Sequence, residues 1–224
     1  MQTKTKVRAL LERLAALHPD ASCALLRRNP FELLCATVLS AQTTDVAVNR
    51  VTPALFERYP TAEAMAAASP EQIEPWIASL GMYRQKARFL VGLSAMLLRE
   101  HAGQVPASLE ALVRLPGVGR KTANVVLGVA FGKPEGVVVD THVLRLAQRL
   151  GWSRFDTPDR VEQDLCRLLP REDWDCVAHV LIFHGRRVCS AQRPGCDVCG
   201  VSDACPSAFQ AVHVGRRGRR TRTP

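Results

Sequence analysis

The chain has 224 residues, 47% of them hydrophobic, and a formal net charge of +9. This length predicts one large domain or two small ones with a sizeable core, and the positive charge favours a polyanionic partner, above all nucleic acid. The absence of a long apolar run argues against a membrane protein, and the absence of an apolar leader favours the cytoplasm.

Helical signals dominate from the N-terminus onward. Leucines recur at helical spacing over residues 10–17. A capping residue precedes a proline at Asn29-Pro30, Ser69-Pro70 and Thr157-Pro158, a pattern typical of helix starts. Three glycines fall where helices should stop, at Gly103, Gly132 and Gly151. The run Val137–Val139 is too short and isolated for a sheet, so we expect an all-α protein of about ten helices.

The stretch Leu115–Lys121 reads Leu-Pro-Gly-Val-Gly-Arg-Lys. A helix expected from about Ser108 leads into it, and an apolar helix over 122–131 leaves it. Such a turn has little side-chain bulk, so its amides at a helix N-terminus are suited to an anion such as a phosphate. From the turn alone, a purely structural connection remains an alternative.

Eight cysteines divide into two groups. Four are scattered through apolar helical contexts and are expected to be buried small hydrophobes. The other four are Cys189, Cys196, Cys199 and Cys205, with the spacing Cys-x6-Cys-x2-Cys-x5-Cys. Without a secretory leader, this crowding indicates metal rather than disulfides. On the chemistry alone, a zinc ion and a [4Fe–4S] cluster are equally acceptable.

The ordered combination of motifs resembles the endonuclease III family of helix–hairpin–helix DNA glycosylases. The likeness rests on 115–124, on Val139-Asp-Thr-His-Val143, on the four cysteines, and on the segments 39–45 and 80–83. It implies two helical domains with the active site in the cleft between them. A six-helix domain over 22–133 would carry the hairpin at about 108–131. A cluster domain would combine 1–21 with 134–211, followed by a basic, disordered tail over 212–224.

The resemblance implies a base-excision-repair enzyme that removes oxidised pyrimidines from damaged duplex DNA and then cuts the strand. It assigns the nucleophile to Lys121 and a catalytic carboxylate to Asp140, and it favours a [4Fe–4S] cluster on the four cysteines. The helix N-terminus and neighbouring Arg120 disfavour the ammonium form of Lys121, and burial against the apolar helix face would add to this. By position alone, Asp140 also fits a helix N-cap.

Further residues are expected to contact DNA. Gln42 matches the family's gap-filling glutamine, while Met82 stands at the wedge position where the family carries leucine. Gly117, Gly119 and Arg120 would hold phosphate at the hairpin. Three more residues complete the expected set: Thr141, His142 and Arg193. His142 fits a structural role equally well.

Arg193 is the one charged residue of the loop 190–195. The family usually has several basic residues there, so weaker phosphate anchoring is predicted, offset in part by Arg186, Arg187 or the five arginines of the tail.

Two alternatives compete with this interpretation. One is a mismatch glycosylase, for thymine or adenine, of the same superfamily. An adenine-specific enzyme would carry a glutamate where this chain has Cys35–Val38. The other is a non-enzymatic DNA-binding module with a structural metal. We expect a monomer in the cytoplasm, associated with the nucleoid if the source is bacterial.

Overall fold

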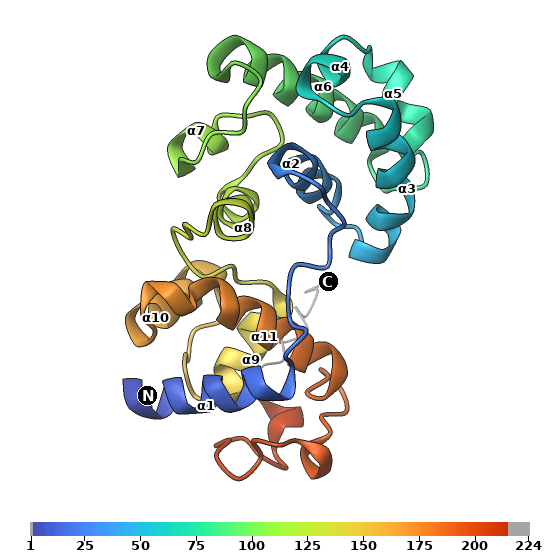
Figure 1. Cartoon of the computed structure of the whole chain (residues 1–224). Helices are drawn as coiled ribbons and strands as arrows, with labels where there is room; N and C mark the ends of the chain where they lie inside the picture. The colour runs from blue at the N-terminus through green and yellow to red at the C-terminus, as the bar shows by residue number, and fades with distance from the viewer. Residues whose placement is uncertain (1, 215–224) are drawn as a thin grey trace, which may run out of the picture. The chain divides into compact units, whose positions relative to one another are not determined.

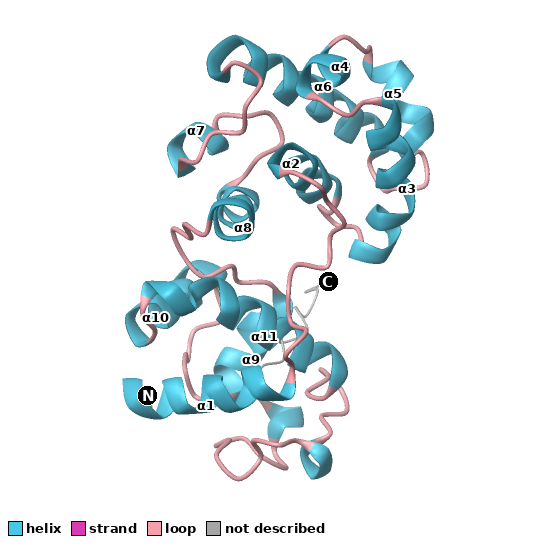
Figure 2. Ribbon diagram, in the orientation of Figure 1, coloured by secondary structure: helices cyan, strands magenta, loops and turns pink. Residues whose placement is uncertain are grey.

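The computed structural model describes residues 2–214 and is helical throughout this part (Figures 1 and 2). It contains no strand within these residues, apart from one isolated bridge between Cys189 and Pro194. The expected all-α class is confirmed. None of the helices in the described part is long and apolar enough to cross a membrane.

The chain forms two compact units, which divide it after Ser22 and after Glu135. The first unit is Cys23–Glu135. The second combines residues 2–22 with residues 136–214. Each unit has its own hydrophobic core.

The unit Cys23–Glu135 contains helices α2 to α8. Their bounds are α2 Pro30–Leu39, α3 Asp45–Arg58, α4 Ala62–Ala66, α5 Pro70–Ile77, α6 Tyr83–His101, α7 Leu109–Val113 and α8 Arg120–Phe131. Side chains from α2, α6 and α8 supply much of the core. Every residue of α8 from Thr122 to Phe131 is buried or half-buried, as its apolar sequence predicts.

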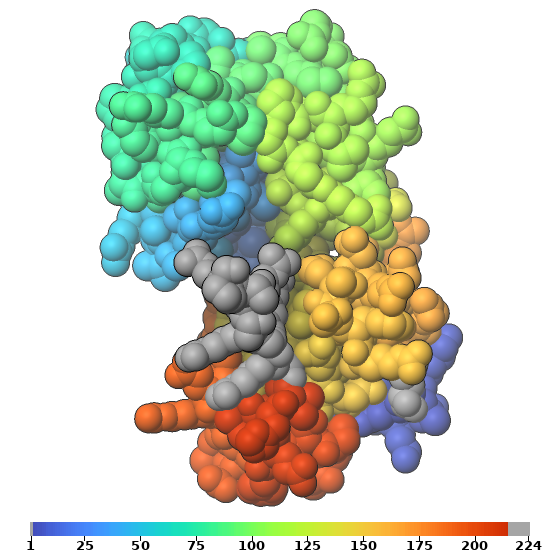
Figure 3. All heavy atoms as spheres, turned by 180° about the vertical axis from the view of Figure 1, so that it is seen from behind, coloured from blue at the N-terminus to red at the C-terminus, as the bar shows by residue number. Residues whose placement is uncertain are grey.

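The other unit contains α1, α9, α10 and α11 with three short 3-10 turns. Their bounds are α1 Lys4–Leu17, α9 Thr141–Arg149, α10 Pro158–Leu168, η1 Arg171–Asp173, α11 Trp174–Arg187, η2 Cys196–Val198 and η3 Ala211–His213. The core is built around fully buried Trp152. The described C-terminal part of this unit is the red region of Figure 3.

Helix ends follow local chemistry. Asn29, Ser69 and Thr157 are N-caps, each followed by proline, and Ser69 forms a capping box with Gln72. Gly103, Gly132 and Gly151 all adopt positive φ at helix ends. The tail expected over 212–224 is described only to residue 214, where the Val214 carbonyl accepts from Arg149 at 2.9 Å. The five tail arginines lie outside the described residues.

Candidate active site and cysteine cavity

The turn between α7 and α8 leaves its backbone open on one side. Val118 N–H donates to Leu115 O at 3.1 Å, and Gly117 has φ +77°, which makes Leu115–Val118 a type II turn. The first helical bond of α8 joins Ala123 N–H to Gly119 O at 2.9 Å, so the amides of the preceding turn lack helical partners. A Cβ placed on Gly119 would meet nothing within 4 Å. A phosphate can therefore approach this backbone closely.

Lys121 is the second residue of α8 and its side chain is exposed. The burial expected from the apolar character of the helix is wrong, because the buried residues of α8 begin two positions later, at Ala123. Arg120 is also exposed. Both cationic side chains are therefore exposed at the start of α8, directly after the turn.

Asp140 is the N-cap of α9, and one of its two carboxylate oxygens accepts both capping hydrogen bonds. Oδ1 accepts from the amides of His142 and Val143, both at 2.8 Å. Oδ2 has no partner within residues 2–214. The side chain is half-buried. The two alternatives drawn from the sequence are therefore compatible: capping fixes the carboxylate and leaves its second oxygen available.

His142 is held by a residue that the sequence did not single out. Arg145 Nη2 donates to His142 Nδ1 at 3.1 Å, and also to Gly185 O and Cys189 O at the same distance. Because a guanidinium only donates, the neutral imidazole carries its proton on Nε2. Burial, with the charges of Arg145 and Arg186, lowers the pKa of His142 against the opposing effect of Asp140. Thr141 beside it is exposed.

Gly185 explains how α11 approaches α9 so closely. A Cβ at this position would meet Arg145 Nη2 and His142 Nδ1, each at 2.9 Å. In the sequence, Gly185 cannot be distinguished from any other glycine within a helix.

Gln42 and Met82 are exposed residues in the left-handed region of φ. Gln42 lies in the loop between α2 and α3 with φ +54°, and Met82 is the N-cap of α6 with φ +57°. The Met82 side chain is 52% exposed. Residues with side chains seldom adopt this conformation, and they concentrate at functional sites. Within the described residues, Ala102 and Phe209 are the other two side-chain-bearing residues with positive φ, and neither belongs to a motif.

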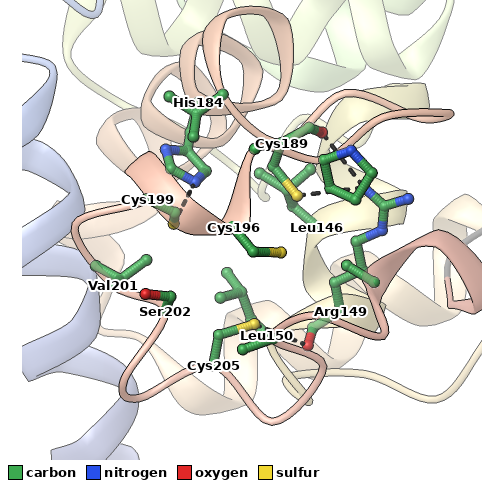
Figure 4. Close-up of a pocket in the computed structure, with 15 residues that line it drawn as sticks. Leu146, Arg149, Leu150, His184, Cys189, Cys196, Cys199, Val201, Ser202 and Cys205 are labelled. Atoms are coloured by element: carbon green, nitrogen blue, oxygen red, sulfur yellow. Dashed lines mark hydrogen bonds between the residues drawn. The ribbon is translucent and has the colours of Figure 1, made fainter.

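The four clustered cysteines surround one cavity in the second unit (Figure 4). The lining of the cavity is otherwise mainly apolar, with Leu146, Leu150 and Val201 among its walls. The four sulfur atoms are arranged around the same space in Figure 4. Burial raises the pKa of the thiols of Cys199 and Cys205. A positive group in the cavity would restore the thiolates.

Two buried side chains contact the cysteine sulfurs. Arg149 Nη1 lies 3.2 Å from Cys189 Sγ and donates to Ser190 O at 2.7 Å, and Arg149 Nη2 donates to Ala191 O at 2.9 Å. His184 Nε2 lies 3.5 Å from Cys199 Sγ, and its Nδ1 faces His18 Nε2 at 2.9 Å. Sequence reasoning missed Arg149, because a long charged side chain on a helix normally faces solvent.

A zinc ion and a [4Fe–4S] cluster require different spacings of the four sulfur atoms. Four thiolates on one zinc ion would bring the sulfurs within about 4 Å of one another, since each Zn–S bond is near 2.3 Å. Within the described part of the chain, no three Cys, His, Asp or Glu side chains converge on a single ion. Cysteines spread around a shared apolar cavity suit a multinuclear cluster, in which each thiolate binds a different iron.

The loop between the first two cysteines carries exposed Arg193 at its tip. The Ser190 hydroxyl closes the loop, donating to Arg193 O at 2.6 Å and accepting from Arg193 N–H at 3.1 Å. Arg187 is already engaged, because Asp20 binds both of its terminal nitrogens at 2.8 and 2.6 Å. Less of its charge is therefore free for phosphate than the sequence suggested.

Comparison with known proteins identifies the family of this chain. The model of the "HhH-GPD superfamily base excision DNA repair protein" family matches residues 35–171. Endonuclease III of Synechocystis sp. is 48% identical over 92% of this chain and 94% of its own length. Endonuclease III of Bacillus subtilis is 47% identical over 87% of this chain and 89% of its own length.

The fold is shared with a solved structure of a trapped covalent intermediate between endonuclease III and DNA, in an estranged-adenine complex. That protein is 47% identical, with a TM-score of 0.86 over 94% of this chain and 99% of its own. With the family match covering more than half of the sequence, this chain belongs to the HhH-GPD superfamily of base excision DNA repair proteins.

Proposed function

We propose that Lys121 is the nucleophile of this base-excision-repair DNA glycosylase and AP lyase. One observation carries the assignment: exposed Lys121 lies in the first turn of α8, directly after a glycine turn whose backbone is open on the side of Gly119. A strand bound at this turn would be fixed within reach of the amine. The relative trapped as a covalent intermediate with DNA supports covalent chemistry in this chain too.

The reaction begins with the neutral amine of Lys121. Its nitrogen bonds to C1′ while the glycosidic bond breaks, and the base leaves with the bonding electron pair and is protonated. The sugar ring opens as the amine loses its proton, which gives a Schiff base. The imine acidifies the C2′ proton, and removal of that proton expels the 3′ phosphate by β-elimination. The strand is then cut 3′ to the lesion.

Asp140 acts on the charge that develops at the sugar. We propose that Oδ2, left free by the N-cap, stabilises oxocarbenium-like positive charge and assists proton transfer. The amides on Oδ1 hold the carboxylate in a fixed orientation.

The target nucleotide must leave the base stack before it is attacked. We propose that Gln42 and Met82 enter the duplex in its place, Gln42 bonding the estranged base and Met82 acting as the wedge. Gly117, Gly119 and Arg120 hold the backbone, Thr141 and His142 line the site, and Arg193 contacts a more distant phosphate. Oxidised pyrimidines in duplex DNA are the proposed substrates, processed by a monomer in the cytoplasm at the nucleoid.

We also propose that Cys189, Cys196, Cys199 and Cys205 hold a [4Fe–4S] cluster. The cluster would cross-link the segment from Cys189 to Cys205, which has little regular structure of its own. The shared cavity and its apolar walls support this assignment.

The function is tested with borohydride trapping on duplexes containing an abasic site or one of a panel of damaged bases. Wild type should form a covalent adduct and cut the strand, and Lys121→Ala should do neither. Lys133→Ala, just beyond the other end of α8, is the matched control and should behave as wild type. An adduct with Lys121→Ala would move the nucleophile elsewhere. Excision of mismatched thymine or adenine in preference to oxidised bases would show that the substrates are mismatched bases rather than oxidised pyrimidines.

A further inference from the structure

Lys86 is a charged residue in the core of the unit Cys23–Glu135. Lys86 lies in the first turn of α6 and is only 2% exposed. Ala87 and Leu90 of the same helix are fully buried. Burial lowers the pKa of its ammonium. An apolar side chain at this position would avoid the desolvation cost of a charge, so stability alone does not account for a lysine.

The ammonium of Lys86 holds the loop that carries Gln42. Lys86 Nζ donates to Thr43 Oγ1 at 2.7 Å, and the Thr43 hydroxyl donates in turn to Ala41 O at 3.3 Å. Ala41 and Thr43 are the two neighbours of Gln42. The hydrogen-bonded chain from Lys86 therefore brackets the residue with positive φ.

The backbone of the same lysine holds Met82. Lys86 N–H donates to Met82 O at 3.0 Å, which is the first helical bond of α6. Two unusual backbone positions are thus connected through one residue. A side-chain-bearing residue in the left-handed region costs about 1 kcal/mol or more, and it persists only where its surroundings hold it.

We propose that Lys86 is a positioning residue that couples Gln42 to Met82, so that the two enter the duplex as one rigid pair. Thr43 relays this coupling through its hydroxyl. The inference rests on the proposed function, in which these two side chains occupy the space of the flipped nucleotide. It adds a residue that contacts neither DNA nor the reacting atoms, and whose contribution is to the opening of the base stack.

The test measures base unstacking directly. A duplex carries a non-cleavable abasic analogue with 2-aminopurine opposite to it, and fluorescence rises as the estranged base leaves the stack. The variants are Lys86→Met, Thr43→Val, both together, and Thr43→Ser, which keeps the hydroxyl. The rate of excision of an oxidised pyrimidine and the melting temperature are measured on the same proteins.

Lys86→Met and Thr43→Val should each reduce excision about tenfold, as expected for one hydrogen bond to a charged group, and should lower the fluorescence change. The double variant should lose no more than either single variant. Thr43→Ser should remain close to wild type. Lys86→Met should melt no lower than wild type, because it removes a buried charge while keeping the length of the side chain.

Three outcomes would overturn the inference: unchanged fluorescence and excision in Lys86→Met, losses that multiply in the double variant, or losses that follow the melting temperature in every variant. Failure of the proposed function would appear differently. Wild type itself would then form no borohydride-trapped adduct with abasic duplex DNA.

Discussion

At the scale of single residues, the hairpin glycines have two separate roles. Gly117 has φ +77°, and a Cβ there would meet the Phe89 ring at 2.7 Å. Gly119 has an ordinary φ of −89° and open space beside it. Gly117→Ala should therefore lower the free energy of unfolding by about 2–4 kcal/mol through backbone strain and overpacking. Gly119→Ala should cost no more than about 1 kcal/mol.

DNA binding should separate the same two variants. The added methyl group of Gly119→Ala stands where a phosphate would approach, so affinity for an abasic-analogue duplex should fall about fivefold or more, equivalent to about 1 kcal/mol. Urea unfolding and fluorescence anisotropy measure the two effects. Unchanged affinity in a folded Gly119→Ala protein would contradict phosphate binding at this turn.

The sequence selected candidate site residues but did not predict their conformation. Motifs selected Gln42 and Met82, yet their positive φ could not be foreseen, because neither side chain favours that region. The exposure of Lys121 was misjudged from the apolar residues that follow it. Lys86 escaped notice because the sequence between Gly81 and Leu90 contains other cations, and only packing distinguishes the buried one.

At the scale of helices, the N-terminus of α9 allows capping and catalysis at Asp140 to be separated. Asparagine caps a helix about as well as aspartate but carries no charge. Asp140→Asn should keep the wild-type melting temperature, while Asp140→Ala should lose about 1 kcal/mol of stability. Both should reduce single-turnover base excision about 100-fold or more. If Asp140→Asn retained excision, Asp140 would be a cap alone.

Helix boundaries were predictable because their signals are local. A capping side chain before a proline and a glycine after a helix act within a few residues, and the structure confirms these caps. The contacts of Arg145 and Arg149 join α9 to residues about 40 positions later in the chain. No local sequence pattern encodes such a contact. The role of these two arginines in holding the segment beside the cysteine cavity is therefore visible only in the structure.

At the scale of the whole molecule, the four cysteines should determine whether the end of the second unit is folded. Cys199→Ser removes one cavity sulfur, whereas Cys176→Ser alters an exposed cysteine outside the group. Purified Cys199→Ser should lose bound iron and visible absorbance and should unfold more readily, while Cys176→Ser should match wild type. Metal analysis and thermal melts give both answers. Stoichiometric zinc with no iron in wild type would contradict the cluster assignment.

The net charge of +9 describes the whole chain, but salt dependence reports only the cations that reach phosphate. Arg193 is exposed, and its guanidinium has no partner within residues 2–214. Arg187 is exposed too, but it is bound on two nitrogens by Asp20. The hydrogen bond with Arg187 lowers the pKa of Asp20, so this pair stays ionised at neutral pH.

Arg193→Ala should therefore reduce the slope of log affinity against log salt by about one unit, since one counterion fewer is released on binding. Arg187→Ala is the matched control and should change the slope much less, because Asp20 already neutralises that charge. Asp20→Ala should steepen the slope by freeing Arg187. Anisotropy titrations with duplex DNA across a range of salt concentrations measure all three. Equal slopes for Arg193→Ala and wild type would show that the loop at Arg193 does not meet the DNA backbone.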